Sequence, residues 1–207
     1  LVVVKEPTVG YEQSRYMTRL MQMAVHQFGA DWVAPLDADE FIEPEVGQTV
    51  AQILERHPGE LLSIPWHNFE WRPENDADPE INPVIKQRLR LPLRTDHKKL
   101  FIPRSRIGEK TVLDQGNHRL LDDDQISMGT PLRTIALCHF PIRSVAQYAG
   151  KIAVGYLQYS AMAHWDRHSG WHYIEPFRLL AGGLDQLVQT MQAGSRRYSL
   201  TETDPSG

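Results

Sequence analysis

The sequence predicts an α/β domain in which helices flank a mixed sheet. Helical spacing of apolar residues alternates with short apolar runs along the chain, which is the rhythm of an α/β fold. The clearest case is the apolar stripe from Met17 to Phe28, which Gly29 closes and the apolar run 32–36 follows. The 207 residues, 41% of them hydrophobic and only one a cysteine, suit one domain held by its core.

The elements follow from local patterns. Expected strands are residues 1–4, 32–36, 61–66, 84–95, 99–103 and 133–140, and expected helices are 17–28, 49–57, 144–162 and 175–193. Residues 84–95 alternate basic and apolar side chains, which is typical of an edge strand with one solvent-exposed face. Three prolines in 67–83 indicate a loop or lid. We expect one domain over 1–193, with C-terminal helices in 144–193 and a flexible tail over 194–207.

Charge and hydropathy exclude two classes of partner. Lys and Arg number 22 against 26 Asp and Glu, a net charge of −4. Binding to nucleic acid needs a clustered basic excess, so we expect no nucleic-acid partner. No apolar run approaches the roughly 20 residues that cross a bilayer, so we expect no membrane span and a cytoplasmic protein.

Two carboxylates follow the second expected strand, at Asp37 and Asp39. A buried strand that ends in carboxylates at i and i+2 puts both on the same side, at the carboxyl edge of the sheet where open α/β folds bind ligands. Paired carboxylates repel unless a cation lies between them, and Mg²⁺ or Mn²⁺ held this way commonly completes its shell with substrate phosphates. The alternative is an acidic turn in which either aspartate caps backbone N–H groups.

Residues 31–41, which read DWVAPLDADEF, resemble the metal-binding Asp-x-Asp segment of family-2-like glycosyltransferases of the GT-A fold. The similarity is to the branch whose segment reads Asp-x-Asp-Glu-Phe. Further pieces in the same order are IPWHNF at 64–69, KKLFIP at 98–103, GNH at 116–118 and CHFPIRS at 138–144, which leads to Lys151.

The resemblance implies a GT-A-like, Rossmann-related mixed sheet flanked by helices. It also implies that this sheet is partial at its N-terminus, because the family's strand-helix-strand unit that binds the nucleotide would precede Leu1. It also implies transfer of a sugar from a nucleotide-diphosphate donor to the hydroxyl of a glycan or other acceptor. Asp37 and Asp39 would bind Mn²⁺ or Mg²⁺, which neutralises the leaving diphosphate. His139 matches the family's late histidine ligand, and His118 is the second candidate.

An inverting transferase also needs a carboxylate base to deprotonate the acceptor. The family's Glu-Asp pair does not occur after Asp39, and Glu70 and Asp114 are the nearest substitutes. Trp66 and Phe69 stand beside Glu70 and offer aromatic rings that could stack on a sugar.

Two basic residues follow His139. Arg143 precedes the N-cap residue Ser144, and Lys151 follows two turns later. Both could hold a diphosphate through charge and helix N–H donors. The equal alternative is that both are solvated surface charges.

Two other functions remain open. An apolar strand ending in Asp-x-Asp is also the first motif of haloacid-dehalogenase-like phosphatases. That family has a small hydroxyl residue at the position of Phe41. A truncated, non-catalytic domain that binds carbohydrate or a protein partner is the other alternative.

Overall fold

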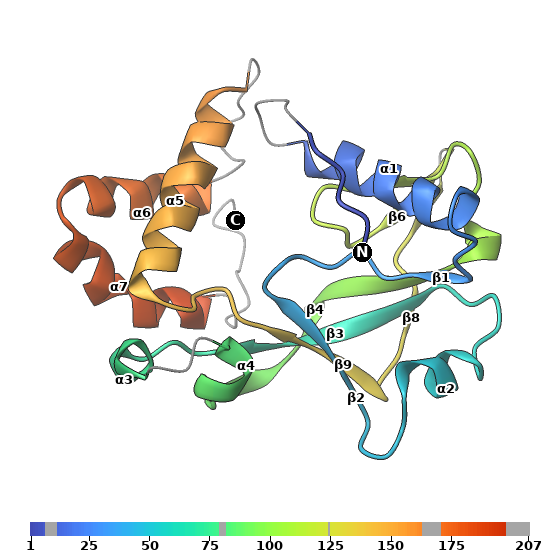
Figure 1. Ribbon diagram of the computed structural model, residues 1–207, viewed down its shortest axis with the longest axis horizontal. Coiled ribbons are helices and arrows are strands. Elements are labelled where there is room, and N and C mark those ends of the chain that lie inside the picture. The colour runs from blue at the N-terminus through green and yellow to red at the C-terminus, as the bar shows by residue number, and fades with distance from the viewer. Residues whose placement is uncertain (7–11, 79–81, 124, 163–170, 198–207) are drawn as a thin grey trace, which may run out of the picture.

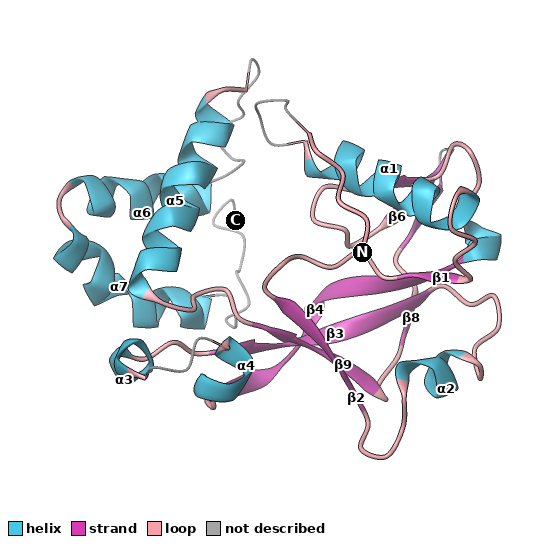
Figure 2. Ribbon diagram, viewed as in Figure 1, coloured by secondary structure: helices cyan, strands magenta, loops and turns pink. Residues whose placement is uncertain are grey.

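The computed structural model describes residues 1–6, 12–78, 82–123, 125–162 and 171–197. Within them, α1 (Gln13–His26) lies over one end of a curled mixed sheet, and a group of three C-terminal helices lies beyond the other end (Figures 1 and 2). The mixed α/β architecture that the sequence predicts is thus confirmed.

The main sheet has six strands, in the order β1-β4-β3-β9-β2, with β8 paired to β3 outside this path. Its strands are β1 (Trp32–Val33), β2 (Glu40–Pro44), β3 (Leu62–Phe69), β4 (Arg90–Pro103), β8 (Thr130–Pro131) and β9 (Ile135–His139). A second, three-stranded sheet joins β5 (Val112–Leu113), β6 (Leu120–Asp122) and β7 (Gln125–Ser127).

Strand direction brings several chain segments to one edge of the main sheet. β1 and β3 both pair antiparallel with β4, and β3 pairs parallel with β9, so β1, β3 and β9 run the same way. β2 is antiparallel to β9 and begins where β9 ends, with Glu40 opposite His139. Because β1 and β2 stand at opposite ends of the strand order, the connecting segment 34–39 crosses the sheet (Figure 1). That segment carries Asp37 and Asp39 toward the end of β9.

The helices begin and end where local chemistry indicates. Besides α1, they are α2 (Val50–Leu54), α3 (Pro73–Ala77), α4 (Pro83–Lys86), the 3₁₀ turn η1 (Arg104–Arg106), α5 (Val145–Ser160), α6 (Trp171–Ala181) and α7 (Leu184–Arg197). Ser144 caps α5 by accepting the Gln147 N–H at 3.1 Å, as expected of an N-cap serine. Gly183, at φ +128°, separates α6 from α7, so the single helix expected over 175–193 is two helices.

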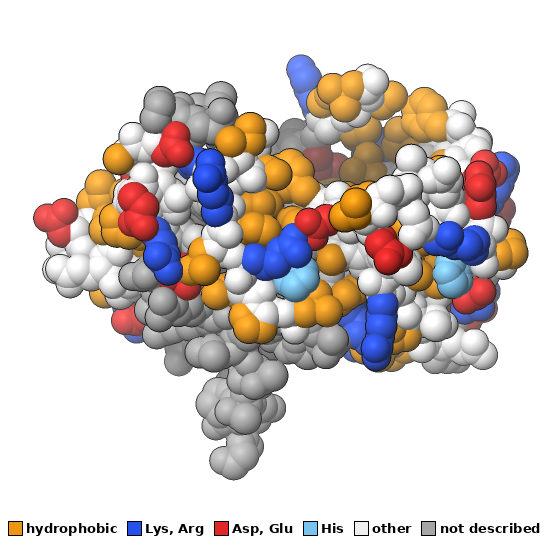
Figure 3. Space-filling view, turned by 90° about the horizontal axis from the view of Figure 1, so that it is seen from below, with side chains coloured by type: hydrophobic (Ala, Val, Ile, Leu, Met, Phe, Trp, Pro, Cys, Tyr) orange, Lys and Arg blue, Asp and Glu red, His pale blue; other side chains and the backbone are white. Residues whose placement is uncertain are grey.

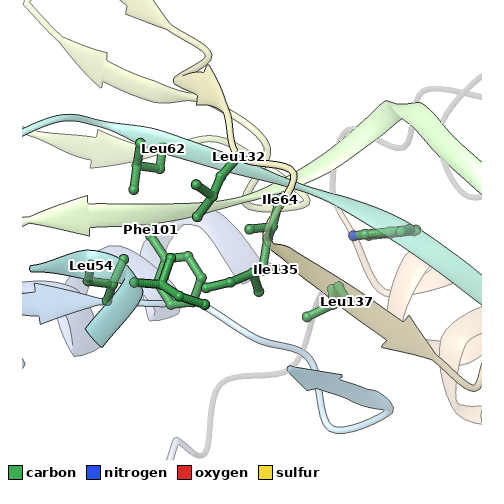
Figure 4. Packing of buried hydrophobic residues seen from close by; sticks show 9 residues of the cluster. Leu54, Leu62, Ile64, Phe101, Leu132, Ile135 and Leu137 are labelled. Carbon is green, nitrogen blue, oxygen red and sulfur yellow. The ribbon is translucent and has the colours of Figure 1, made fainter. Parts of the chain in front are cut away.

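Three of the apolar clusters among the described residues join flanking elements to the sheet. The largest packs α2 against the sheet, and its side chains converge in Figure 4: Ile53, Leu54, Leu62, Ile64, Trp66, Phe101, Leu132, Ile135 and Leu137. A second joins α1, through Met21 and Val25, to β4 and the small sheet. A third gathers α5 and α7 around Trp71, just beyond β3. Each cluster therefore fixes one set of flanking elements to the sheet.

Several predicted strands were wrong in place or extent. Residues 1–4 form no strand, and the side chains of Leu1, Val2 and Val3 are exposed. β-branched residues favour a strand only where they can pack on a sheet, and this segment does not pair with one. Segments 84–95 and 99–103 belong largely to the single strand β4, which pairs with β3 along its length and with β1 only at Ile102 and Pro103. The prediction of two separate strands was therefore wrong, whereas the described part of β4 within 84–95 has a strand partner on one side, β3.

The expected loop 67–83 is also shorter than predicted. β3 runs on to Phe69, and α3 and the start of α4 lie in this segment, each with proline at its first turn. At the other end of the chain, α7 continues past Gly194 to Arg197, and residues 198–207 of the expected tail lie outside the described residues.

The described surface shows mixed chemistry. On the face drawn in Figure 3, basic and acidic side chains are interspersed among hydrophobic ones. None of the described helices combines the length and apolar character that crossing a membrane requires.

Candidate active site

Asp37 and Asp39 lie in a turn, and not on a strand. β1 ends at Val33, and Pro35, which has no N–H to donate, follows. The Glu40 N–H donates to the Asp37 carbonyl at 3.1 Å, and Glu40 Oε2 accepts the Asp37 N–H at 2.8 Å. The predicted strand 32–36 is therefore too long, and the two aspartates do not share one strand face.

Asp37 belongs to a closed ring of hydrogen bonds. Its Oδ1 accepts from Gln13 Nε2 at 2.8 Å, and its Oδ2 accepts from Lys99 Nζ at 2.8 Å. Gln13 Oε1 accepts the Gly116 N–H at 3.2 Å, and the Gly116 carbonyl accepts from Lys99 Nζ at 2.9 Å. The ring ties α1, the aspartate turn, β4 and the loop 114–118 together.

Lys99 and Glu40 form the buried floor beneath this turn. The Lys99 side chain is 1% exposed, and its Nζ lies 3.5 Å from Glu40 Oε1. Burial raises the pKa of the Glu40 carboxyl to about 7, which Lys99 opposes and Asp37 reinforces. A buried lysine needs a carboxylate partner, and Lys99 contacts two.

Asp39 faces a different set of groups. Its Oδ2 accepts from Lys151 Nζ at 2.8 Å, and its Oδ1 lies 3.8 Å from His139 Nε2. Burial alone would raise the pKa of the Asp39 carboxyl, but the Lys151 ammonium, together with the His139 imidazole when it is protonated, outweighs burial and the pKa lies below its ordinary value. Asp39 is thus held as a carboxylate.

His139 is held from behind by Asn68. The parallel pairing of β3 and β9 sets these residues in register, and Asn68 Oδ1 lies 2.7 Å from His139 Nδ1. The Trp66 ring packs on the His139 ring, with centroids 4.7 Å apart. The imidazole therefore has a fixed place at the carboxyl end of β9.

Asp39 and His139 fit the role of two ligands to one divalent cation. Carboxylate oxygen and imidazole nitrogen are both suitable donors, and Mg²⁺ or Mn²⁺ sites often use few protein ligands plus substrate phosphates. Asp37 fits this role less well, because Lys99 and Gln13 occupy both of its oxygens. Across the described segments, no group of three or more His, Cys, Asp or Glu side chains is arranged to hold a metal ion.

The two candidate bases lie apart in the fold. Glu70 follows β3 directly, is 1% exposed, and has its Oε1 3.7 Å from Arg72 Nε. Asp114 organises the loop 114–118: it accepts from the His118 N–H at 2.7 Å and from Arg119 Nε at 2.8 Å. The prediction of a base role stays untested for both.

The other predicted histidine and aromatic residues take part in packing. His118 Nδ1 lies 2.6 Å from the Lys98 carbonyl, and its ring centroid is 5.8 Å from that of Trp66. Trp66 is buried, and Phe69 is buried in a stack on Phe140, with centroids 4.4 Å apart. The role of His118 as a cation ligand, and those of Trp66 and Phe69 in stacking on a sugar, stay predictions.

Arg143 and Lys151 differ in their surroundings. Lys151 is ion-paired with Asp39, and its side chain is 27% exposed. The Arg143 N–H donates to Gln147 Oε1 at 2.9 Å, while its Nε is buried with no hydrogen-bond partner among the described residues. The structure therefore brings Lys151, but not the Arg143 guanidinium, into contact with the aspartate turn.

The sequence interpretation missed four members of the site: Gln13, Glu40, Asn68 and Lys99. A signal existed for Glu40, Asn68 and Lys99, since all three lie in segments that carry the resemblance, at 31–41, 64–69 and 98–103. Gln13 carried none, because its partners are distant in sequence. Comparisons with protein families, with curated proteins and with solved structures find no match, so a functional assignment rests on this chain's own residues.

Proposed function

We propose that this chain is the catalytic portion of a metal-dependent glycosyltransferase that moves a sugar from a nucleotide-diphosphate donor to an acceptor hydroxyl. The observation that carries the proposal is convergence. The segments on which the resemblance rests contribute Asp39, Asn68 and His139 to one group of contacts at the carboxyl end of β9. They contribute Lys99 and Gly116 to a second group around Asp37, and the turn that holds Asp37 and Asp39 joins the two groups. Packing alone gives no reason for polar residues of five separate segments to meet there.

The proposed chemistry assigns distinct parts to the residues. A divalent cation held by Asp39 and His139 would neutralise negative charge on the leaving diphosphate. Lys151 reaches Asp39 and is partly exposed, so its ammonium can also bind a phosphate oxygen. The bond from the anomeric carbon to the phosphate oxygen breaks with its electron pair on the diphosphate. The acceptor oxygen bonds to that carbon and loses its proton to a carboxylate base.

Of the two residues considered as the catalytic base, Glu70 is the better candidate because of its position. It lies two residues beyond Asn68, the register partner of His139, so it follows β3 at the same edge of the sheet. Asp114 is committed to its own loop, where its oxygens accept from two backbone N–H groups and from Arg119 Nε.

One observation favours the second candidate function, a non-catalytic domain that binds carbohydrate or a protein partner. Asp37 and Asp39 are each paired with a lysine, so both carboxylates are neutralised by the protein itself. Such a turn is stable without a cation. The two functions differ in what a cation and a nucleotide do to the fold.

The test is thermal unfolding of the full chain with Mn²⁺, with uridine or guanosine diphosphate, and with both together. A ligand that binds only the folded state stabilises it and so raises its Tm. At a ligand concentration of 100 times Kd, the free energy of unfolding increases by about 2.7 kcal/mol. We expect a joint effect of metal and nucleotide that Asp39→Ala abolishes. Asp31→Ala, which removes an exposed carboxylate just before β1, is the matched control and should keep the effect. No shift in any condition would contradict the transferase and leave the non-catalytic domain.

A further inference from the structure

We propose that Asn68 is a positioning residue that fixes the His139 ring with its Nε2 turned toward Asp39. The inference rests on the proposed function, because it assigns Asn68 to the support of the proposed cation site. It concerns the orientation and the hydrogen position of one imidazole, both of which can be measured without any ligand.

The strand register makes the contact possible. Asn68 on β3 and His139 on β9 are direct partners in a parallel pair, so their side chains lie on the same face of the sheet. Asn68 is 0% exposed, and the His139 side chain is nearly as buried. A buried amide costs free energy unless it is hydrogen-bonded, and the 2.7 Å contact between Oδ1 and Nδ1 meets that need.

The chemistry of the contact sets the hydrogen position. An amide oxygen can only accept a hydrogen bond, so the His139 nitrogen that faces it carries the hydrogen. In a neutral imidazole the other nitrogen, Nε2, then carries the lone pair. Nε2 faces Asp39 Oδ1 at 3.8 Å, which is longer than a hydrogen bond. This is the tautomer that a histidine needs in order to bind a cation through Nε2.

The neighbours of the imidazole also limit its rotation. The Trp66 ring packs on it, and Glu40 is its register partner on the other side, in β2. Metal-binding histidines generally donate their second N–H to an oxygen that fixes tautomer and ring orientation, and loss of that partner typically costs 10- to 100-fold in metal affinity. Asn68 occupies that supporting position.

The first measurement reads the tautomer directly. Long-range ¹H–¹⁵N correlation spectra of the metal-free chain, labelled at histidine, distinguish a hydrogen on Nδ1 from one on Nε2. We expect His139 in the wild type to carry it on Nδ1, and Asn68→Leu to yield a mixture or the other tautomer. Ser63→Ala is the matched control, because it removes a buried polar group from the same strand but contacts Gly129 and not His139.

The second measurement is Mn²⁺ affinity, followed by electron paramagnetic resonance of the free ion. We expect Asn68→Leu to weaken binding 10- to 100-fold and Ser63→Ala to leave it near the wild-type value. A neutral wild-type imidazole with its hydrogen on Nε2, or an Asn68→Leu chain with unchanged tautomer and affinity, overturns the proposal. If Asn68→Leu does not fold, Asn68→Asp, which keeps an acceptor oxygen, must retain the Nδ1 hydrogen, and its loss also overturns the proposal. Absence of Mn²⁺ binding in the wild type contradicts the proposed function alone, since the spectra still decide the role of Asn68.

Discussion

Lys99 Nζ lies 2.8 Å from Asp37 Oδ2, in a place where the lysine side chain is 1% exposed. The same ammonium lies near Glu40 and donates to the Gly116 carbonyl. One buried charge therefore compensates two carboxylates and joins β4 to the aspartate turn.

Replacement of Lys99 by methionine should destabilise the protein severely. Loss of one partner of a buried ion pair costs about 3 to 5 kcal/mol, and we expect the lower end because Asp37 is partly exposed to water. Urea unfolding measures the loss. Lys110→Met, which breaks an exposed pair with Asp123, is the control and should cost less than about 1 kcal/mol. Equal losses in the two variants would show that Lys99 is not an internal counter-ion.

Glu40 should make the protein less stable as pH rises toward neutrality. The pKa of its carboxyl is about 7 in the folded protein and ordinarily about 4.5, so the folded state binds more protons between these values. The free energy of unfolding then falls as pH rises through this window, by on the order of 3 kcal/mol at most, since one pKa unit is about 1.4 kcal/mol.

The measurement for Glu40 is urea unfolding at pH 5 and pH 7.5, for the wild type and for Glu40→Gln. The glutamine cannot ionise, so this variant should lose less stability over the interval than the wild type does. Histidines titrate in the same window, and the comparison of the two chains removes their contribution. Parallel pH profiles would contradict the assignment of the raised pKa to Glu40.

The alternation of helix and strand was predictable because periodicity and capping are local. The apolar spacing of α1 and the Ser144 cap of α5 each depend on neighbours within a few residues. The extent of the strands was not local. β4 reads as two short segments, but it is one strand because β3 pairs with both segments, from Arg90 to Phe101.

The site was predictable in part for the same reason. Asp39, His139 and Lys151 were all candidates, and the structure places them in contact. It was not predictable that Asp37 would contact a different group of residues from Asp39, because the spacing i and i+2 puts two side chains on the same side only in a strand. The chain turns at this point instead, and the turn sends the two carboxylates to different lysines.

Gly116→Ala should be costly because of both the backbone and the contact with His118. Gly116 has φ +96°, and an added Cβ would lie 2.8 Å from the His118 ring. Gly47, at φ +84° with open space around it, is the matched control for the backbone cost of about 1 to 2 kcal/mol. We expect Gly116→Ala to exceed Gly47→Ala in loss of stability and to shift the His118 ring resonances. Similar losses with unchanged resonances would show that the ring moves away freely.

Asp37 and Asp39 should contribute unequally to binding of a cation, although both belong to the Asp-x-Asp segment. Both oxygens of Asp37 accept from Gln13 and Lys99, whereas Asp39 faces His139 and the partly exposed Lys151. Asp39→Asn should therefore abolish stabilisation by Mn²⁺. Asp37→Asn should retain most of it but lower Tm in the absence of metal, because Lys99 loses a charged partner. Thermal unfolding with and without Mn²⁺ separates the two effects. If Asp37→Asn removes the Mn²⁺ effect as completely as Asp39→Asn does, Asp37 must leave Lys99 when the cation binds, and the ring around it would be a resting arrangement.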